Sequence, residues 1–399
     1  MKKKVAIIIK SLKNGGAERV VSVLSNSFNK NYDFDIILFD SRGIDYSYSG
    51  NIIDLKFYKL DTKFFKIFHF LKLLIKKYRL YKIKYKNNYD CVISFVTNTN
   101  KLHMQTYMKN QKNIITIHNN VSIQKNFKTS NKNKLLLSNL YKKADEIIAV
   151  SEGVKYDLHS YFNISNEKIK VIYNPININE ILEFEDETIQ DNKLRSIFEK
   201  HDVLINVGSL NDQKAQWNLI RSFSEVYKKF PNTRLVIFGR GKYEQKFQTL
   251  INGLNLNNLV ILAGYSKSIF TYMFKSKLFL MSSSHEGLGM VIIEALACSL
   301  PVVSTDCKSG PREILAPNTD VTKTTTELEL TKYGYLTPLM NKTFQSIEKP
   351  LSKEEHLFSK AIQNILSNNN IYEDMRKNAL NRAKDFDLEK IETIWENII

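Results

Sequence analysis

The sequence predicts an α/β protein of two facing Rossmann-like domains, each a doubly wound parallel sheet flanked by helices. The chain has 399 residues, which is more than one hydrophobic core usually serves. Short apolar runs alternate with helical patterns along its whole length, as is typical of parallel βαβ units. Each half carries about five such runs, enough for one sheet of ordinary size.

The expected strands are short apolar runs bounded by polar sequence. In the first half they cover Val5–Ile9, Asp35–Phe39, Cys91–Phe95, Asn113–Ile117 and Glu146–Val150. In the second half they cover Val203–Val207, Arg234–Phe238, Leu259–Leu262, Leu278–Met281 and Pro301–Ser304. The alternation breaks at Asn174-Pro175-Ile176, and acidic sequence follows. We therefore expect an N-terminal domain at 1–176, a linker region at 177–200, a C-terminal domain at 201–385, and a helix at 386–399 that is placed to pack back on the N-terminal domain.

The net charge of +17 belongs entirely to the first part of the chain. Residues 1–180 contain 31 Lys and Arg against 14 Asp and Glu, so the remainder is neutral overall. A compositional bias toward lysine would not leave the second part neutral. A basic domain needs an anionic partner, and the candidates are a lipid surface, a diphosphate and nucleic acid.

The most basic segment is 62–86, which contains nine Lys or Arg and no acid. Its apolar residues fall on one face at the helical period; they are Phe64, Ile67, Phe68, Leu71, Leu74, Ile75 and Tyr78. Two interpretations stay open. The stripe can simply pack on the sheet, or the helix can lie on an anionic membrane. The absence of acids favours the membrane, with Lys72, Lys76, Lys77 and Arg79 as the contacting cations.

No stretch approaches the roughly 20 apolar residues of a spanning helix. The run Val5–Ile9 is too short for the apolar core of a signal peptide. We therefore expect a cytoplasmic protein that is peripheral at the inner face of the cell membrane.

Neither a metal nor another cofactor is expected. The three cysteines, Cys91, Cys298 and Cys307, lack metal-type spacing. Two Asp-x-Asp triplets occur, but the one at 33–35 enters a strand and the one at 385–387 lies near the C-terminal helix.

Two strand-to-helix turns have the composition of ligand-binding loops. Gly15-Gly16 follows the first strand and opens a helix, where backbone amides can approach a phosphate. The second turn follows Leu278–Met281 and places Glu286 in a loop, while the amides of Leu288, Gly289 and Met290 lie at the mouth of the next helix. Glu294 lies about two turns into that helix on an apolar face, where a carboxylate needs hydrogen-bond partners such as ribose hydroxyls. A buried salt bridge for Glu294 and a solvated loop for Glu286 are the plain alternatives.

These features resemble glycosyltransferase family 4, retaining enzymes with the GT-B fold. Glu286 and Glu294 match its paired-glutamate motif, and Gly15–Arg19 matches its N-terminal glycine loop. Val207–Lys214 is similar to its diphosphate loop, and Phe238–Gly241 to its next glycine turn. Thr305–Ile314 is typical of members that build bacterial surface glycans such as capsule and lipopolysaccharide.

The resemblance implies a role for each matching residue. Glu286 would hydrogen-bond the donor sugar, helped by the Leu288–Met290 amides, and Glu294 would bind the ribose. Lys214 would neutralise the donor diphosphate. Gly16 would approach the same diphosphate, and His118 would lie near the donor sugar. The family commonly has Arg where this chain has Ser209, so either Lys214 suffices or Arg240 or Arg312 supplies the charge.

The resemblance thus predicts transfer of a hexose or N-acetylhexosamine from a nucleotide sugar, most simply UDP-linked, to a lipid-linked or surface-polysaccharide acceptor that approaches the basic N-terminal domain. Two alternatives stay open. A UDP-sugar epimerase of similar fold would also bind UDP-sugar but needs no basic helix. A nucleic-acid-binding protein would explain the charge alone, although no reader motif is recognisable.

Overall fold

The computed structural model describes residues 2–13, 15–57, 69–123 and 131–399. The chain divides into two compact units. The first unit consists of Met1–Ile176 together with Leu388–Ile399, and the second of Asn177–Asp387. Region 177–200 contains the helices α7 (Ile178–Leu182) and α8 (Asn192–Lys200), and it belongs to the second unit.

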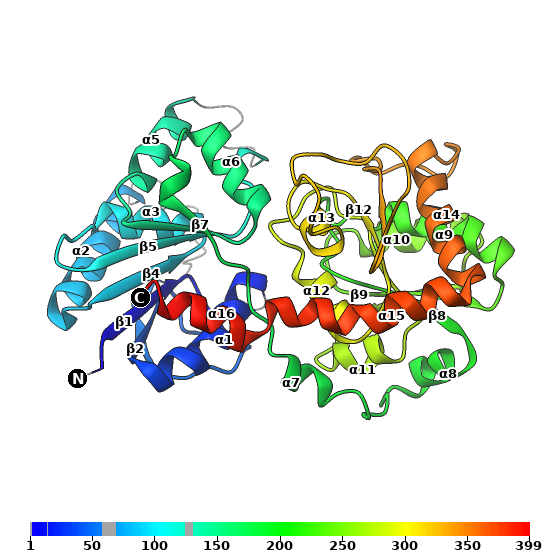
Figure 1. Cartoon of the computed structure of the whole chain (residues 1–399), viewed down its shortest axis with the longest axis horizontal. Helices are drawn as coiled ribbons and strands as arrows, with labels where there is room; N and C mark the ends of the chain where they lie inside the picture. The colour runs from blue at the N-terminus through cyan, green and yellow to red at the C-terminus, as the bar shows by residue number, and fades with distance from the viewer. Residues whose placement is uncertain (1, 14, 58–68, 124–130) are drawn as a thin grey trace. The chain divides into compact units, whose positions relative to one another are not determined.

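The first unit contains a parallel sheet of seven strands in the order β3-β2-β1-β4-β5-β6-β7 (Figure 1). The strands are β1 (Lys4–Ile9), β2 (Asp33–Leu38), β3 (Asn51–Asp54), β4 (Cys91–Phe95), β5 (Lys112–Ile117), β6 (Glu146–Ala149) and β7 (Ile169–Val171). The edge strands β3 and β7 are additional to the expected ones. Both are short and partly exposed, so they lack the continuous apolar run that marks a central strand.

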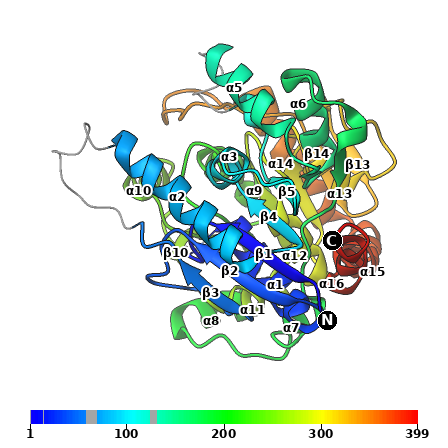
Figure 2. The same cartoon turned by 90° about the vertical axis from the view of Figure 1, so that its left-hand side faces the viewer.

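Helices cover both faces of this sheet (Figure 2). On one face, α1 (Gly16–Asn31) and α16 (Leu388–Glu396) share a core with β1, β2 and β4. Trp395 of α16 meets Phe28 of α1 edge to face, with ring centroids 6.1 Å apart. On the other face, α2 (His69–Asn87) and α3 (Thr97–Gln105) contribute Leu80 and Leu102 to a second core. The helices α5 (Asn131–Tyr141) and α6 (Glu152–Phe162) follow later in the chain.

The second unit contains another seven-stranded sheet, in the order β10-β9-β8-β11-β12-β14-β13. Its strands are β8 (Asp202–Val207), β9 (Thr233–Phe238), β10 (Val260–Gly264), β11 (Leu278–Met281), β12 (Val302–Thr305), β13 (Glu329–Thr331) and β14 (Gly334–Thr337). Only the β13–β14 pair is antiparallel. The chain runs outward from β8 to β10 and then returns to β11 beside β8. A doubly wound sheet binds ligands at such a reversal, beyond the carboxyl ends of the strands.

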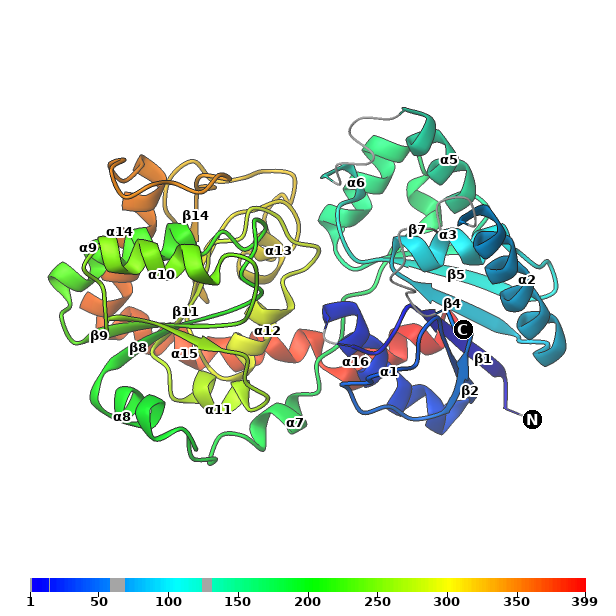
Figure 3. The ribbon, with the colours of Figure 1, turned by 180° about the vertical axis from the view of Figure 1, so that it is seen from behind.

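Two helical layers enclose the second sheet (Figure 3). One layer contains α9 (Trp217–Lys229), α10 (Glu244–Gly253) and α14 (Lys353–Ser367). The opposite layer contains α11 (Ile269–Phe274), α12 (Met290–Ala297) and α15 (Asn369–Ala383). The short helix α13 (Pro311–Leu315) follows β12. Because the chain returns to the middle of the sheet at β11, the turn from β11 into α12 lies at the reversal point.

Candidate active site

The loops that follow β8 and β11 are tied together by hydrogen bonds. The Ser282 hydroxyl donates to the carbonyl oxygen of Lys214 at 2.8 Å. The backbone N–H and the hydroxyl of Ser284 both donate to the carbonyl oxygen of Gln213, at 2.8 and 3.1 Å. The side-chain amide of Gln216 donates to the Gly208 carbonyl at 3.3 Å. Side chains in one loop therefore have fixed positions relative to the other.

Glu286 is held by two consecutive residues of the β8 loop. Its side chain is nearly buried, since the residue is only 7% exposed. Lys214 Nζ lies 2.6 Å from Oε1, and Gln213 Nε2 donates to Oε2 at 3.3 Å. The second hydrogen of the same Gln213 amide is directed to the His285 carbonyl at 2.9 Å. The structure thus brings the predicted residues Glu286 and Lys214 into direct contact.

The mouth of α12 is shaped by two glycines. Gly289 precedes the helix with φ 85°, a left-handed conformation that side chains disfavour. Gly310 packs so closely on the same turn that a Cβ there would lie 1.8 Å from the Leu288 carbonyl oxygen. The turn residues Leu288 and Gly289 are buried, and Met290 is the first residue of α12. The N-terminus of α12, where backbone N–H groups can bind an anion, therefore lies at the reversal of the sheet.

Glu294 lies on α12, one residue before Ala295, and is as deeply buried as Glu286. The pKa of the neighbouring Cys298 thiol is raised, chiefly by burial and further by the Glu294 carboxylate. A nearly buried carboxylate needs hydrogen-bond donors around it, and sugar hydroxyls can serve as such donors.

Two arginines, Arg240 and Arg312, could supply the positive charge that Ser209 lacks. One of them, Arg312, already forms ion pairs. The Arg312 guanidinium binds Asp306 at 2.5 Å and Glu329 at 2.7 Å, so its charge is already paired. Arg240 is exposed, and its carbonyl accepts a hydrogen bond from the N–H of Leu210 at 3.1 Å. Ser209 is exposed at the tip of the same loop. Arg240 is therefore beside the Ser209 loop with its guanidinium open to solvent.

In the first unit, α1 begins at Gly16, directly after Gly15. The N–H of Gly15 donates to the Tyr46 hydroxyl at 3.4 Å. A Cβ added at Gly16 would meet nothing within 4 Å, so the surrounding protein does not require glycine there. The open space beside this backbone is consistent with close approach by a ligand.

We expect Gly16→Ala to separate folding from binding. The unfolding temperature should be unchanged or slightly raised, because alanine favours helix and the added methyl has room. If a phosphate approaches this backbone, donor KM should rise about tenfold, corresponding to about 1.4 kcal/mol. Thermal unfolding and steady-state kinetics measure the two effects. An unchanged donor KM would show that the turn has no contact with the donor.

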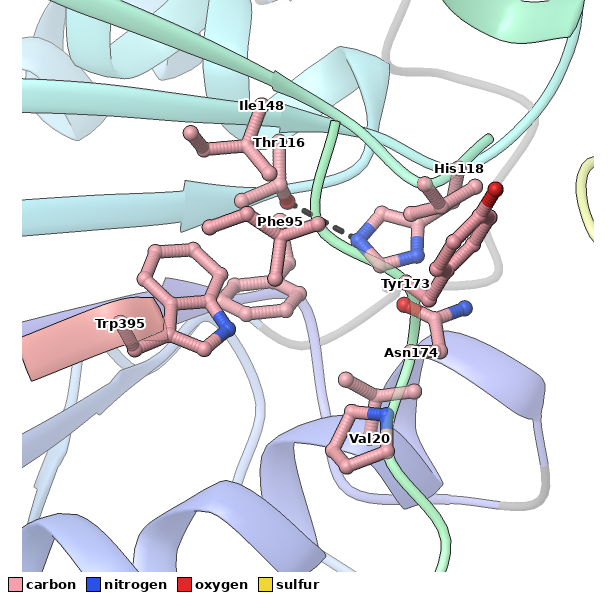
Figure 4. Close-up of a pocket in the computed structure, with 11 residues that line it drawn as sticks. Val20, Phe95, Thr116, His118, Ile148, Tyr173, Asn174 and Trp395 are labelled. Carbon is pink, nitrogen blue, oxygen red and sulfur yellow. Dashed lines mark hydrogen bonds between the residues drawn. The ribbon is translucent and has the colours of Figure 1, made fainter. Parts of the chain in front are cut away.

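His118 follows β5 and lines a small pocket in the first unit (Figure 4). The Thr116 hydroxyl donates its one hydrogen to the Ser94 carbonyl at 3.0 Å. His118 Nε2, 2.9 Å from the same hydroxyl, must therefore be the donor in that contact. Burial lowers the pKa of His118 to about 4, so the ring is neutral at pH 7. This assignment leaves Nδ1 as a hydrogen-bond acceptor.

Two of the four cations predicted for membrane contact lie against their own domain. Lys76 Nζ lies 5.1 Å from the centre of the Phe57 ring, and burial lowers the pKa of Lys76. The Arg79 guanidinium donates to the Leu55 carbonyl at 2.9 Å and stacks on Phe57. Lys72, Lys76 and Lys77 are all partly exposed, and Arg79 is exposed. Two of the expected membrane contacts therefore also make contacts within their own domain.

The outward face of α2 is apolar and aromatic as well as basic. The apolar residues exposed on it are Leu71, Leu74, Ile75, Tyr78, Tyr81 and Tyr85. Lys82 and Lys86 are exposed on the same helix. The sheet is instead covered by Leu73, Leu80 and Ile83. The described part of the stripe expected from sequence thus faces outward; its members Phe64, Ile67 and Phe68 lie outside the described residues. Among the described residues, no helix is long and apolar enough to cross a bilayer.

Two family descriptions match the chain. "Glycosyltransferase Family 4" matches residues 14–180, and "Glycosyl transferases group 1" matches residues 187–327. An uncharacterized glycosyltransferase of Methanocaldococcus jannaschii is 36% identical over 82% of this chain and 83% of its own length.

A Campylobacter jejuni enzyme is 30% identical over 97% of both chains. Its name is N-acetylgalactosamine-N,N'-diacetylbacillosaminyl-diphospho-undecaprenol 4-alpha-N-acetylgalactosaminyltransferase. The Anabaena protein HepE, solved with UDP, superposes with a TM-score of 0.76 at 19% identity and covers 99% of both chains. The last likeness shows the fold, which is GT-B.

Proposed function

The chain belongs to glycosyltransferase family 4, and on that premise we propose that it is a retaining enzyme that moves a hexose or N-acetylhexosamine from a UDP-sugar to a lipid-linked or surface-polysaccharide acceptor. The observation that carries the proposal is the contact of Glu286 with Lys214 at the reversal of the second sheet. This contact places a carboxylate that can accept hydrogen bonds from sugar hydroxyls next to a cation that can neutralise a diphosphate.

The donor roles follow from the chemistry of each group. Lys214 neutralises the diphosphate, and the N–H groups at the start of α12 bind its oxygens or a sugar hydroxyl. Glu294, which is nearly buried on α12, accepts hydrogen bonds from the ribose. In the first unit, neutral His118 would accept a hydrogen bond from a sugar hydroxyl through Nδ1, and Gly16 would admit the diphosphate.

Retention is proposed to proceed by displacement on one face of the sugar. The anomeric bond to the diphosphate breaks while the acceptor hydroxyl adds from the same side, and the departing diphosphate oxygen takes the proton of that hydroxyl. Lys214 and the α12 amides stabilise the charge that develops on the departing diphosphate, and this stabilisation together with positioning is the main contribution of the protein. Glu286 contributes as a sugar ligand that orients the donor.

The acceptor is proposed to be lipid-linked, because the C. jejuni relative is named for an undecaprenyl diphosphate substrate. The outward face of α2 supports this proposal, since it combines exposed tyrosines and leucines with lysines. We place the enzyme in the cytoplasm, peripheral at the inner face of the cell membrane.

The test is a transfer assay with four donors: UDP-N-acetylgalactosamine, UDP-N-acetylglucosamine, UDP-glucose and UDP-galactose. The acceptor is a polyprenyl-diphosphate-linked N-acetylgalactosamine in anionic vesicles, and NMR of the product gives the anomeric configuration. We expect an α-linked product with at least one donor. Activity should survive EDTA, because Lys214 and backbone amides can bear the diphosphate charge.

Three outcomes would contradict the proposal. An inverted anomeric product excludes the retaining mechanism. Formation of an epimer of the UDP-sugar without acceptor favours the epimerase alternative. Loss of turnover with EDTA, restored by manganese or magnesium, shows that a metal stabilises the leaving group instead.

A further inference from the structure

Gln213 belongs to the segment that resembles the diphosphate loop, but the resemblance gave it no role of its own. Its side-chain amide has two hydrogens, and both are used: one is directed to the His285 carbonyl at 2.9 Å and the other to Glu286 Oε2 at 3.3 Å. The opposite carboxylate oxygen, Oε1, contacts Lys214. Glu286 is therefore fixed by one neutral donor and one cation.

Binding of the donor is expected to affect Lys214 and Gln213 differently. A diphosphate competes with Glu286 for the Lys214 ammonium, since both are anionic ligands of one cation. When Lys214 turns to the diphosphate, Glu286 Oε1 loses its partner. Gln213 is neutral and has no such competitor, so its hydrogen bond to Oε2 can persist. Oε1 is then free to accept a hydrogen bond from a sugar hydroxyl.

The backbone of Gln213 is anchored well enough for this role. Its carbonyl accepts both the N–H and the hydroxyl of Ser284, two residues before Glu286. The next N–H, that of Lys214, donates to the Asn211 side chain at 3.0 Å. The amide of Gln213 thus spans from an anchored backbone to the carboxylate and to the adjacent His285 carbonyl.

We propose that Gln213 is the positioning residue for Glu286: it holds Oε2 throughout the reaction and leaves Oε1 for the sugar after Lys214 has moved to the diphosphate. This assignment rests on the proposed transfer function. It also accounts for how Lys214 can serve the diphosphate without releasing the carboxylate that orients the sugar.

The experiment compares Gln213→Met with the wild type, because methionine has similar length and no hydrogen-bond donor. We expect kcat to fall at least tenfold, while the UDP dissociation constant measured by calorimetry changes less than twofold. Gln248→Met on α10 is the matched control. Gln248 is exposed and its side-chain amide donates to Asn252 of the same helix, so that variant should behave as the wild type.

A double-mutant cycle with Glu286→Gln decides whether Gln213 acts through Glu286. If it does, adding Gln213→Met to Glu286→Gln has little further effect on kcat. Fully additive losses, or an equal loss of UDP affinity, would overturn the proposal and make Gln213 part of the loop scaffold. If Gln213→Met fails to fold, Gln213→Asn retains the amide on a shorter chain and should show the same loss of kcat.

Failure of the proposed function gives a different result. In that case the wild type transfers no sugar from any of the four UDP-sugars, although UDP still binds. A wild type that transfers sugar and a Gln213→Met variant with unchanged kcat would overturn only the role of Gln213.

Discussion

Replacing Lys214 with alanine should lower kcat by about a hundredfold to a thousandfold, the range found when one preorganised group that stabilises developing charge is removed. Lys214 is the cation that contacts Glu286 at the mouth of the crevice, and Arg312 is already paired with Asp306 and Glu329. The departing diphosphate would therefore lose the cation that is proposed to neutralise it. UDP affinity should also fall, because the product carries the same charge.

The same substitution should reduce stability. Glu286 is nearly buried, and without Lys214 its carboxylate would keep only the weaker hydrogen bond from Gln213. Breaking a buried ion pair by removing one partner typically costs about 3–5 kcal/mol, and less where solvent reaches the pair as it does at Lys214. Thermal unfolding of Lys214→Ala measures this loss.

The double variant Lys214→Ala with Glu286→Gln separates the two effects. Removing the unpaired carboxylate should restore most of the stability, but it should leave transfer as slow as in Lys214→Ala. Lys242→Ala is the matched control, because Lys242, in the neighbouring loop after β9, forms an exposed ion pair with Asp212. It should change neither stability nor kcat appreciably. A double variant that regained turnover would show that Lys214 serves only to neutralise Glu286.

Most central strands and the positions of the glycine turns could be predicted because they depend on local signals, but the buried four-residue strand β14 was not among the expected ones. Buried parallel strands such as β1 and β4 are continuous apolar runs. The edge strands β3 and β7 are exposed on one side and carry polar residues, so composition does not distinguish them from loops. Gly289 was recognisable because a left-handed turn before a helix favours glycine.

Side-chain partners across the sheet were harder to predict. Gln213 and Glu286 are 73 residues apart in sequence, and their contact depends on β8 and β11 becoming neighbours. The orientation of α2 shows the same limit. Its sequence contains two apolar stripes, and period alone does not reveal which one covers the sheet. Leu80 packs inward, whereas Leu74 and Tyr78 of the stripe chosen from sequence face outward.

The exposed face of α2 leads to a prediction about membrane binding that the charge count alone could not provide. Lys82 and Lys86 are exposed on the helix, together with Tyr78 and Tyr85, which are 65% and 70% exposed. Tyrosine is favoured at the boundary between water and lipid, and each lysine near an anionic surface contributes about 1 kcal/mol. Changing both lysines to glutamine should therefore weaken partitioning to phosphatidylglycerol-rich vesicles about thirtyfold, equivalent to about 2 kcal/mol.

The matched control is Lys76→Gln with Arg79→Gln, which removes the same two charges from the face that contacts Phe57 and Leu55. Because the net charge changes equally, a general electrostatic attraction predicts equal losses of vesicle binding for both variants. A specific outward face predicts that only the Lys82 and Lys86 variant loses binding, while the control loses thermal stability through its broken contacts. High salt should weaken vesicle binding of the wild type, as the change of Lys82 and Lys86 does.

Turnover on two acceptors completes the comparison. The Lys82 and Lys86 variant should process a short-chain, water-soluble acceptor normally and a vesicle-bound acceptor poorly, since its chemistry is intact and only its residence at the surface is shortened. UDP affinity should be unchanged, because Lys82 and Lys86 lie on α2 and are not among the residues proposed to bind the nucleotide. If both variants sediment equally with anionic vesicles and use both acceptors at the wild-type rate, α2 does not bind membrane, and its exposed tyrosines and lysines need another explanation.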